Sequence, residues 1–169
     1  RIRKEPAAHC VATVEAVARE NGAVIQALPA NGTVVVPADD VYTALWREMA
    51  GARNVLTFSD AVAADVTANA QWQATTNRWA LTLHTPAGSA ATTLAQAGRH
   101  NLRNALAAAA CAIAAGLPLQ AVADGLASFA PVAGRSQLRV LQHAGHPLTL
   151  IDDSYNANPD SVRAAITML

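Results

Sequence analysis

The segment between residues 33 and 58 constrains the fold of this chain more than any other. A β-branched run, Thr33–Val36, stops at Pro37 and indicates a buried strand. Asp39-Asp40 fits the start of a helix, and Asn54–Phe58 is a second strand. The apolar residues of that helix recur at helical spacing: Tyr42, Leu45, Trp46 and Met49. Strand, helix and strand in this order predict a right-handed parallel βαβ unit, and hence an α/β fold.

The segments on either side extend this pattern. Apolar residues at helical spacing predict a helix over Val11–Glu20 that ends at Asn21-Gly22. After the βαβ unit, three short Thr-rich segments predict a small antiparallel sheet: residues 65–74, 77–84 and 89–95. A long helix to about Ala115 and a shorter one over Val122–Phe129 complete this part of the chain.

A linker, Pro131–Arg135, marks the predicted domain boundary, so we expect two domains, residues 1–134 and 135–169. Beyond it, Leu138–Gln142 and Leu148–Ile151 predict two strands, and a further helix is expected to begin with Asp160 or Ser161 as its cap. This second unit is too short to close a core and is expected to begin a larger α/β domain. There is no initiator Met, and the last residues continue a helical pattern, so we expect both ends to be cut.

Composition excludes several classes of protein. Twelve basic and twelve acidic residues balance, which argues against a nucleic-acid binder. Hydrophobic residues make up 52% of the chain, yet no apolar run is long enough to predict a membrane span. Cys10 and Cys111 are far apart, which favours a reduced, cytoplasmic protein, and Cys111 is expected to be buried in its helix. The scattered histidines predict no metal site.

Three polar clusters are candidates for chemistry. Asn101 and Asn104, beside His100, lie three apart at a helix start and therefore share one face. Two side-chain amides can donate and accept at once, as the edge of adenine requires. The alternative is that one Asn caps the helix and the other is solvated.

The second cluster is Arg135 beyond Gly134, which is either a surface charge or a guanidinium that holds phosphate or ribose oxygens. The third is the loop Asp152–Ser161, where an apolar strand runs into a dense polar segment. Ligands bind at the carboxyl ends of strands in open α/β sheets, and a carboxylate there can hold a ribose hydroxyl or a magnesium-bound water. The alternative is a plain turn followed by a helix cap.

Together these clusters resemble the Mur ligase family. Residues 98–108 are similar to its adenine-side motif, residues 132–135 to the hinge after its central domain, and residues 152–161 to the member that adds D-alanyl-D-alanine. The resemblance covers the chain from about Val11. It implies the back half of the central ATPase domain, a parallel βαβ unit with a small antiparallel sheet and helices, followed by the start of a Rossmann-like C-terminal domain.

The resemblance also implies an activity, that of an ATP-dependent amide-bond ligase of peptidoglycan precursor synthesis, a cytoplasmic monomer. In that reaction ATP phosphorylates the terminal carboxylate of UDP-N-acetylmuramoyl-tripeptide, Mg²⁺ steadies the charge, and D-alanyl-D-alanine attacks the acyl phosphate. The residues expected to contact the nucleotide are Asn101, Asn104, Arg135 and Asp153. Those expected to line the substrate cleft are Tyr155, Asn156 and Asn158. No catalytic residue or metal ligand is assigned.

One departure from the family matters. The phosphate loop G-x-x-x-x-G-K-[ST] does not occur in the 169 residues, so we expect the chain alone not to hydrolyse ATP. Two other interpretations stay open. A folylpolyglutamate synthase-like ligase belongs to the same superfamily, although Ser154–Asn158 argues against it. A non-catalytic remnant or interaction domain is favoured by the missing phosphate loop.

Overall fold

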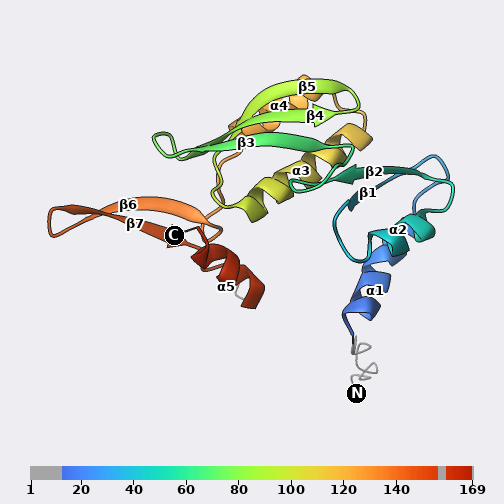
Figure 1. The fold of residues 1–169 in the computed structure, drawn as a ribbon, viewed down its shortest axis with the longest axis horizontal. Coiled ribbons are helices and arrows are strands. Elements are labelled where there is room, and N and C mark those ends of the chain that lie inside the picture. Colours follow the sequence, from blue (N-terminus) through green and yellow to red (C-terminus); the bar gives the residue numbers. More distant parts are fainter. Residues whose placement is uncertain (1–12, 156–158, 169) are drawn as a thin grey trace, which may run out of the picture.

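A computed structural model describes residues 13–155 and 159–168 of the chain (Figure 1). The helices are α1 (Val14–Gln26), α2 (Thr43–Ala50), α3 (Arg99–Ala114), α4 (Leu119–Ser128) and α5 (Pro159–Ile166). The strands are β1 (Thr33–Pro37), β2 (Asn54–Phe58), β3 (Thr67–Gln73), β4 (Arg78–Thr85), β5 (Gly88–Leu94), β6 (Gln137–His143) and β7 (His146–Asp152). None of these helices combines the length and hydrophobicity that a membrane span requires.

The predicted βαβ unit is confirmed. Strands β1 and β2 pair in parallel, with Val34 opposite Val55 and Val36 opposite Thr57. Val34 and Val36 point into a core closed by Ile25 of α1 and Ala50 of α2. The alternation of buried and half-buried residues along β1 follows from the two-residue period of a strand, which sends successive side chains to opposite faces.

The predicted end of the first helix is wrong, because α1 continues through Asn21-Gly22 to Gln26. Gly22 is not a cap but a contact point between helices. A Cβ placed on it would lie 2.7 Å from Met49 Sδ and 3.0 Å from Trp46 Cδ1, both on α2. The glycine therefore allows α1 and α2 to approach closely, and tertiary packing overrides the local stop signal. The indole N–H of Trp46 adds a 2.9 Å hydrogen bond to the carbonyl of Ala18 on α1.

The start of α2 also differs from the prediction. The helix begins at Thr43, not at Asp39-Asp40. Asp40 instead caps the turn that leads into it, since its Oδ1 accepts a 2.9 Å hydrogen bond from the amide of Tyr42. A short polar loop therefore follows the carboxyl end of β1.

The predicted antiparallel sheet is confirmed, with β4 in the centre between β3 and β5. Helix α4 covers β5, while α3 packs against β1, β2 and α4. Figure 1 shows α3 running between the antiparallel sheet and the β1–β2 pair. Its buried face, Leu102, Ala105, Leu106, Ala109 and Ala110, therefore contributes to the cores on both sides. The prediction for Cys111 is wrong, because its side chain lies on the exposed face of α3.

The C-terminal unit consists of the β6–β7 hairpin and α5. The hairpin closes through Ala144-Gly145, both at positive φ, as a two-residue turn requires. Four large apolar side chains of the hairpin are exposed: Val140, Leu141, Leu148 and Leu150. Helix α5 begins at Pro159, so neither Asp160 nor Ser161 is its cap, contrary to the prediction.

A carboxylate ties the end of β2 to the start of the antiparallel sheet. Asp65 Oδ2 accepts hydrogen bonds from Thr57 Oγ1 at 2.6 Å and from the Thr57 amide at 2.8 Å. The hydroxyl bond first, and then the amide bond, lower the pKa of Asp65 below its ordinary value of 3.8. When folding lowers the pKa of a carboxyl group, the group stabilises the folded state at pH values above its pKa in the unfolded chain. This stabilisation is lost as the pH falls through the pKa that the group has in the folded chain.

We therefore predict that Asp65→Asn lowers the free energy of unfolding by about 1 kcal/mol near neutral pH, a value reduced by the exposure of the side chain. The difference from wild type should shrink below about pH 4. Urea unfolding across this pH range measures it. Asp124→Asn on α4, whose carboxylate accepts a hydrogen bond from Gln120, is the matched control. A difference that stays constant down to about pH 2 would contradict this role for Asp65.

Candidate functional site

One pocket brings together residues from both sides of the linker. It encloses about 300 Å³ between the first turns of α3 and the segments that flank the β6–β7 hairpin. Its lining residues are Gln96, His100, Asn101, Asn104, Gly134, Arg135, Ser136, Asp153, Tyr155 and Ser161. The four residues predicted to contact a nucleotide therefore surround one space together with Tyr155. Asn156 and Asn158, also predicted to be there, lie outside the described residues.

Helix α3 presents different groups on different faces. Gly98, at φ 89°, begins the helix, so neither Asn is its cap. At about 100° per residue, His100, Asn104 and Asn101 fall within one sector of the helix. Arg99 and Arg103 fall in another. The first sector faces the pocket, and the second faces the β1–β2 sheet.

The two asparagines form a short chain of hydrogen bonds. Asn101 is buried, and its Nδ2 donates to the carbonyl of Ala97 at 2.7 Å. Asn104 is exposed, and its Nδ2 donates to Asn101 Oδ1 at 3.4 Å. Both Nδ2 and Oδ1 of Asn101 are thus hydrogen-bonded. Asn104 Oδ1 accepts no hydrogen bond from any described residue, so it is free to accept one from a ligand in the pocket.

Across the pocket, the linker and the loop after β7 are bound to each other. Asp153 Oδ1 accepts hydrogen bonds from the amide of Ser136 at 2.8 Å and from its hydroxyl at 3.2 Å. The amide of Tyr155 donates to the carbonyl of Gly134 at 2.9 Å. Within the part of the chain that the structure describes, Asp153 Oδ2 accepts no hydrogen bond. One oxygen of this carboxylate is therefore fixed and the other is available.

The neighbouring Asp152 is used differently. Its Oδ1 accepts from the hydroxyl of Ser154 at 2.7 Å and from the Ser154 amide at 3.3 Å. These bonds, the hydroxyl first, lower the pKa of Asp152 below its ordinary value. Asp152 does not line the pocket and Asp153 does, so the structure separates two adjacent carboxylates that only the family resemblance distinguished in the sequence.

Arg135 and Tyr155 stack at the mouth of the pocket. The guanidinium carbon of Arg135 lies 3.9 Å from the centroid of the Tyr155 ring. Both side chains are exposed, and among the described residues Arg135 makes no ion pair. The stack holds the cation at the pocket while leaving its hydrogen-bond donors free for an anion.

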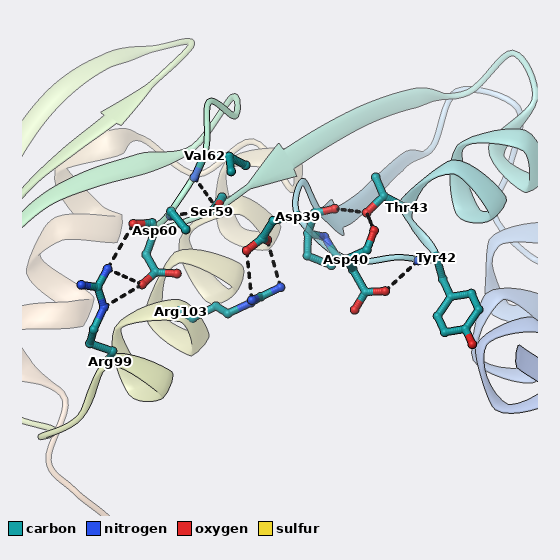
Figure 2. Close-up of polar contacts among 11 residues, drawn as sticks. Asp39, Asp40, Tyr42, Thr43, Ser59, Asp60, Val62, Arg99 and Arg103 are labelled. Carbon is teal, nitrogen blue, oxygen red and sulfur yellow. Dashed lines mark hydrogen bonds and ion pairs between the residues drawn. The ribbon is translucent and has the colours of Figure 1, made fainter. Parts of the chain in front are cut away.

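Sequence reasoning missed the two ion pairs that hold α3 in place (Figure 2). Arg103 forms a bidentate pair with Asp39, just after β1, at 3.0 and 3.2 Å. Arg99 bonds Asp60, just after β2, at 3.1 Å. Both carboxylates lie at the carboxyl ends of parallel strands. The available signal was the spacing of the two arginines by four residues, which puts them on one helix face.

Another, larger cavity lies elsewhere and has different chemistry. It encloses about 590 Å³ along the free edge of β1, against α1 and the end of α3. Its lining is apolar apart from Asn21, Thr33 and the thiol of Cys111. Such a surface has too few hydrogen-bonding groups to recognise a nucleotide, so the smaller polar pocket is the candidate site in spite of its size.

Over residues 13–155 and 159–168, no three His, Cys, Asp or Glu side chains come together where they could hold a metal ion. Magnesium is usually bound by one or two carboxylates together with substrate phosphates and water. The pocket has one carboxylate, Asp153, with one oxygen already bonded. These residues alone do not form a magnesium site.

Comparison with known proteins identifies the family. The sequence pattern of the Mur ligase middle domain matches residues 8–112, which is more than half of the chain. The chain therefore belongs to the Mur ligase family. The matched region includes the whole βαβ unit, the antiparallel sheet and the asparagine pair of α3.

The individual relatives agree with this assignment. The chain is 41% identical over 154 residues to the UDP-N-acetylmuramoyl-tripeptide--D-alanyl-D-alanine ligase of Escherichia coli (strain K12), covering 90% of this chain and 33% of that protein. A crystal structure of MurF from Acinetobacter baumannii superposes with a TM-score of 0.81 at 34% identity, covering 94% and 34% of the two chains. The MurF ligase of Thermotoga maritima in complex with ADP shares the fold, with a TM-score of 0.75 at 22% identity, covering 95% and 35%. The chain spans about a third of the length of these relatives.

Gly134 is the position at which the pocket wall tolerates least change. Its φ is 75°, and an added Cβ would lie 3.1 Å from the amide nitrogen of Tyr155 and 3.3 Å from Ser154 Oγ. We predict that Gly134→Ala destabilises the chain by about 1–3 kcal/mol and increases hydrogen exchange at the Tyr155 amide. Gly145→Ala, at φ 81° with open space around it, is the control for backbone strain alone. Equal effects of the two variants on Tyr155 exchange would refute the close packing of linker and loop.

Proposed function

We propose that the pocket binds the adenosine part of ATP, and that the chain is part of an ATP-dependent ligase that joins D-alanyl-D-alanine to UDP-N-acetylmuramoyl-tripeptide. One observation carries this proposal. Asn104 and Asp153 line the same cavity of about 300 Å³, and each has a side-chain oxygen, Oδ1 and Oδ2 respectively, that accepts no hydrogen bond from a described residue. They come from two units of the chain that the linker joins.

The asparagine pair suits adenine. Because Asn104 Nδ2 donates to Asn101, the amide of Asn104 is oriented with its oxygen available. An acceptor at that point favours a base with an exocyclic amino group over one with a carbonyl there, so it favours adenine over guanine. The buried bond from Asn101 to Ala97 fixes the first amide, and through it the second.

Asp153 and Arg135 suit the rest of the nucleotide. A carboxylate oxygen accepts from ribose hydroxyls, as the acidic residue of many nucleotide-binding α/β folds does. The Arg135 guanidinium, held by stacking on Tyr155, would attract phosphate oxygens. The pocket thus combines one acceptor for the base, one for the sugar and one cation for the phosphates.

In the proposed reaction, ATP would phosphorylate the terminal carboxylate of the tripeptide, and the amine of D-alanyl-D-alanine would attack the acyl phosphate. Magnesium, when bound, would neutralise charge on the phosphates. The residues of this chain would orient the nucleotide, and Tyr155, Asn156 and Asn158 would line the way to the substrate. Positioning of this kind supplies much of the catalysis in phosphoryl transfer.

We further infer two domains, residues 1–134 and 135–169, that enclose the nucleotide between them. The turn at Gly134 and the four exposed apolar side chains of the β6–β7 hairpin support this division. A surface of that kind is covered in a larger domain. We propose that the protein acts as a cytoplasmic monomer.

The test is calorimetric titration with ADP. We expect the wild-type chain to bind weakly, with a Kd on the order of 1 mM, since few phosphate contacts are present. Asn104→Ala should weaken binding about five- to tenfold, because it removes one hydrogen bond to the base. GDP should bind more weakly than ADP to the wild type, and this preference should vanish in the variant. Asn69→Ala, on β3 outside the pocket, is the control for loss of an exposed amide.

Two outcomes would contradict the proposal. If the wild-type chain binds ADP and GDP with the same Kd, Asn104 does not distinguish adenine from guanine. If Asn104→Ala and Asn69→Ala bind ADP as the wild type does, the pocket is not the nucleotide site.

A further inference from the structure

Ser136 also lines the pocket but has no role in the proposed function. Ser136 lies between His100 on α3 and Asp153 after β7. Its Oγ is 3.3 Å from His100 Nε2 and 3.2 Å from Asp153 Oδ1. The residue is buried, although its neighbour Arg135 is exposed. A continuous chain of hydrogen bonds therefore crosses from one wall of the pocket to the other.

The directions of these bonds follow from charge. A hydroxyl has one proton to donate, and a carboxylate is a stronger acceptor than a neutral imidazole nitrogen. The Ser136 hydroxyl thus donates to Asp153 Oδ1. The hydroxyl oxygen of Ser136 then accepts a hydrogen bond from His100. This requires the proton of the neutral imidazole to be on Nε2.

The imidazole ring packs close to the backbone at the start of α3. It lies against Gly98, where an added Cβ would be 2.6 Å from His100 Cε1 and 2.9 Å from Nδ1. The ring is thus close to the backbone at the helix start, with its Nε2 within hydrogen-bond distance of Ser136.

The backbone of Ser136 points to a role for its side chain. Its φ is 48°, in the left-handed region that disfavours residues with a Cβ. Glycine would relieve that strain and keep the amide bond to Asp153. Serine differs from glycine here by its Cβ, which this backbone conformation disfavours, and by its hydroxyl, which makes the two hydrogen bonds.

We propose that Ser136 is a positioning residue of the nucleotide pocket. Its hydroxyl joins His100 to Asp153, holds Asp153 with Oδ2 directed to the ligand, and fixes the separation of the two pocket walls. This inference rests on the proposed function, because it assigns to Asp153 the task of holding the ribose.

The test compares ADP affinity and stability in four chains: wild type, Ser136→Gly, His100→Ala and the double variant. Ser136→Gly should weaken ADP binding about threefold to tenfold while the thermal midpoint stays equal or rises, since the strained backbone is relaxed. The double variant should bind no more weakly than the worse single variant, because both break the same chain. Ser154→Ala, whose hydroxyl bonds Asp152 instead, is the matched control and should bind as wild type.

A second measurement needs no nucleotide. Nitrogen-15 NMR of the His100 ring at mildly alkaline pH should find the proton on Nε2 in the wild type, and Ser136→Gly should change that ring's nitrogen shifts. A proton on Nδ1, or shifts that Ser136→Gly leaves unchanged, would overturn the hydrogen-bond chain.

The two proposals fail in different ways. Failure of the wild type to bind ADP would refute the nucleotide site and, with it, the positioning role. If Asn104→Ala binds ADP more weakly as expected but Ser136→Gly binds it as tightly as the wild type, the nucleotide site is supported and the role of Ser136 is refuted. Additive losses in the double variant would show that His100 and Ser136 act separately, which also contradicts the inference.

Discussion

The placement of α3 is the constraint on which the rest of the structure depends. Its alanine-rich face packs into the cores on both sides, because small side chains let the helix lie close to β1, β2 and α4. Arg99 and Arg103 then fix its N-terminal turns to the carboxyl ends of the two parallel strands (Figure 2). Partly exposed ion pairs such as these contribute little stability, on the order of 1 kcal/mol or less, so their main effect is on orientation. Once the helix is oriented in this way, the other sector, with His100, Asn101 and Asn104, faces the linker and the loop after β7.

Much of the fold could be predicted from the sequence because its signals are local. The β-branched run of β1, the alternation along β4 and the glycine at the start of α3 each determine nearby backbone. The errors arose where tertiary contact decides. Asn21-Gly22 has the composition of a helix end, yet Gly22 is a contact with Met49 and Trp46, and no sequence pattern reveals a partner on another helix. The exposure of Cys111 likewise depends on which face of α3 the strands cover.

The residues of the candidate site could be predicted from the sequence, but the hydrogen bonds between them could not. Asn101, Asn104, Arg135 and Asp153 were found from motif and resemblance, and the structure brings them to one pocket; their contact with a nucleotide stays a prediction. The sequence could not show which of Asn101 and Asn104 has an atom available for a ligand, since both are asparagines on one helix face, and only the resemblance distinguished Asp153 from Asp152. Hydrogen bonding separates them: Asn101 is engaged on both sides of its amide while Asn104 has a free oxygen. Ser136 belongs to no motif, and only its burial and its distances to His100 and Asp153 single it out.

We expect one ligand to occupy the space between the two units of the chain that the linker joins. The most direct test follows the amide resonances of the chain by two-dimensional NMR as ADP is added. The account predicts that resonances of Asn104 on α3 and of Asp153 and Tyr155 beyond β7 shift together, along curves that fit one dissociation constant. Shifts confined to one of the two units, or two sets of curves with different constants, would show that the asparagines and the carboxylate do not serve a common site.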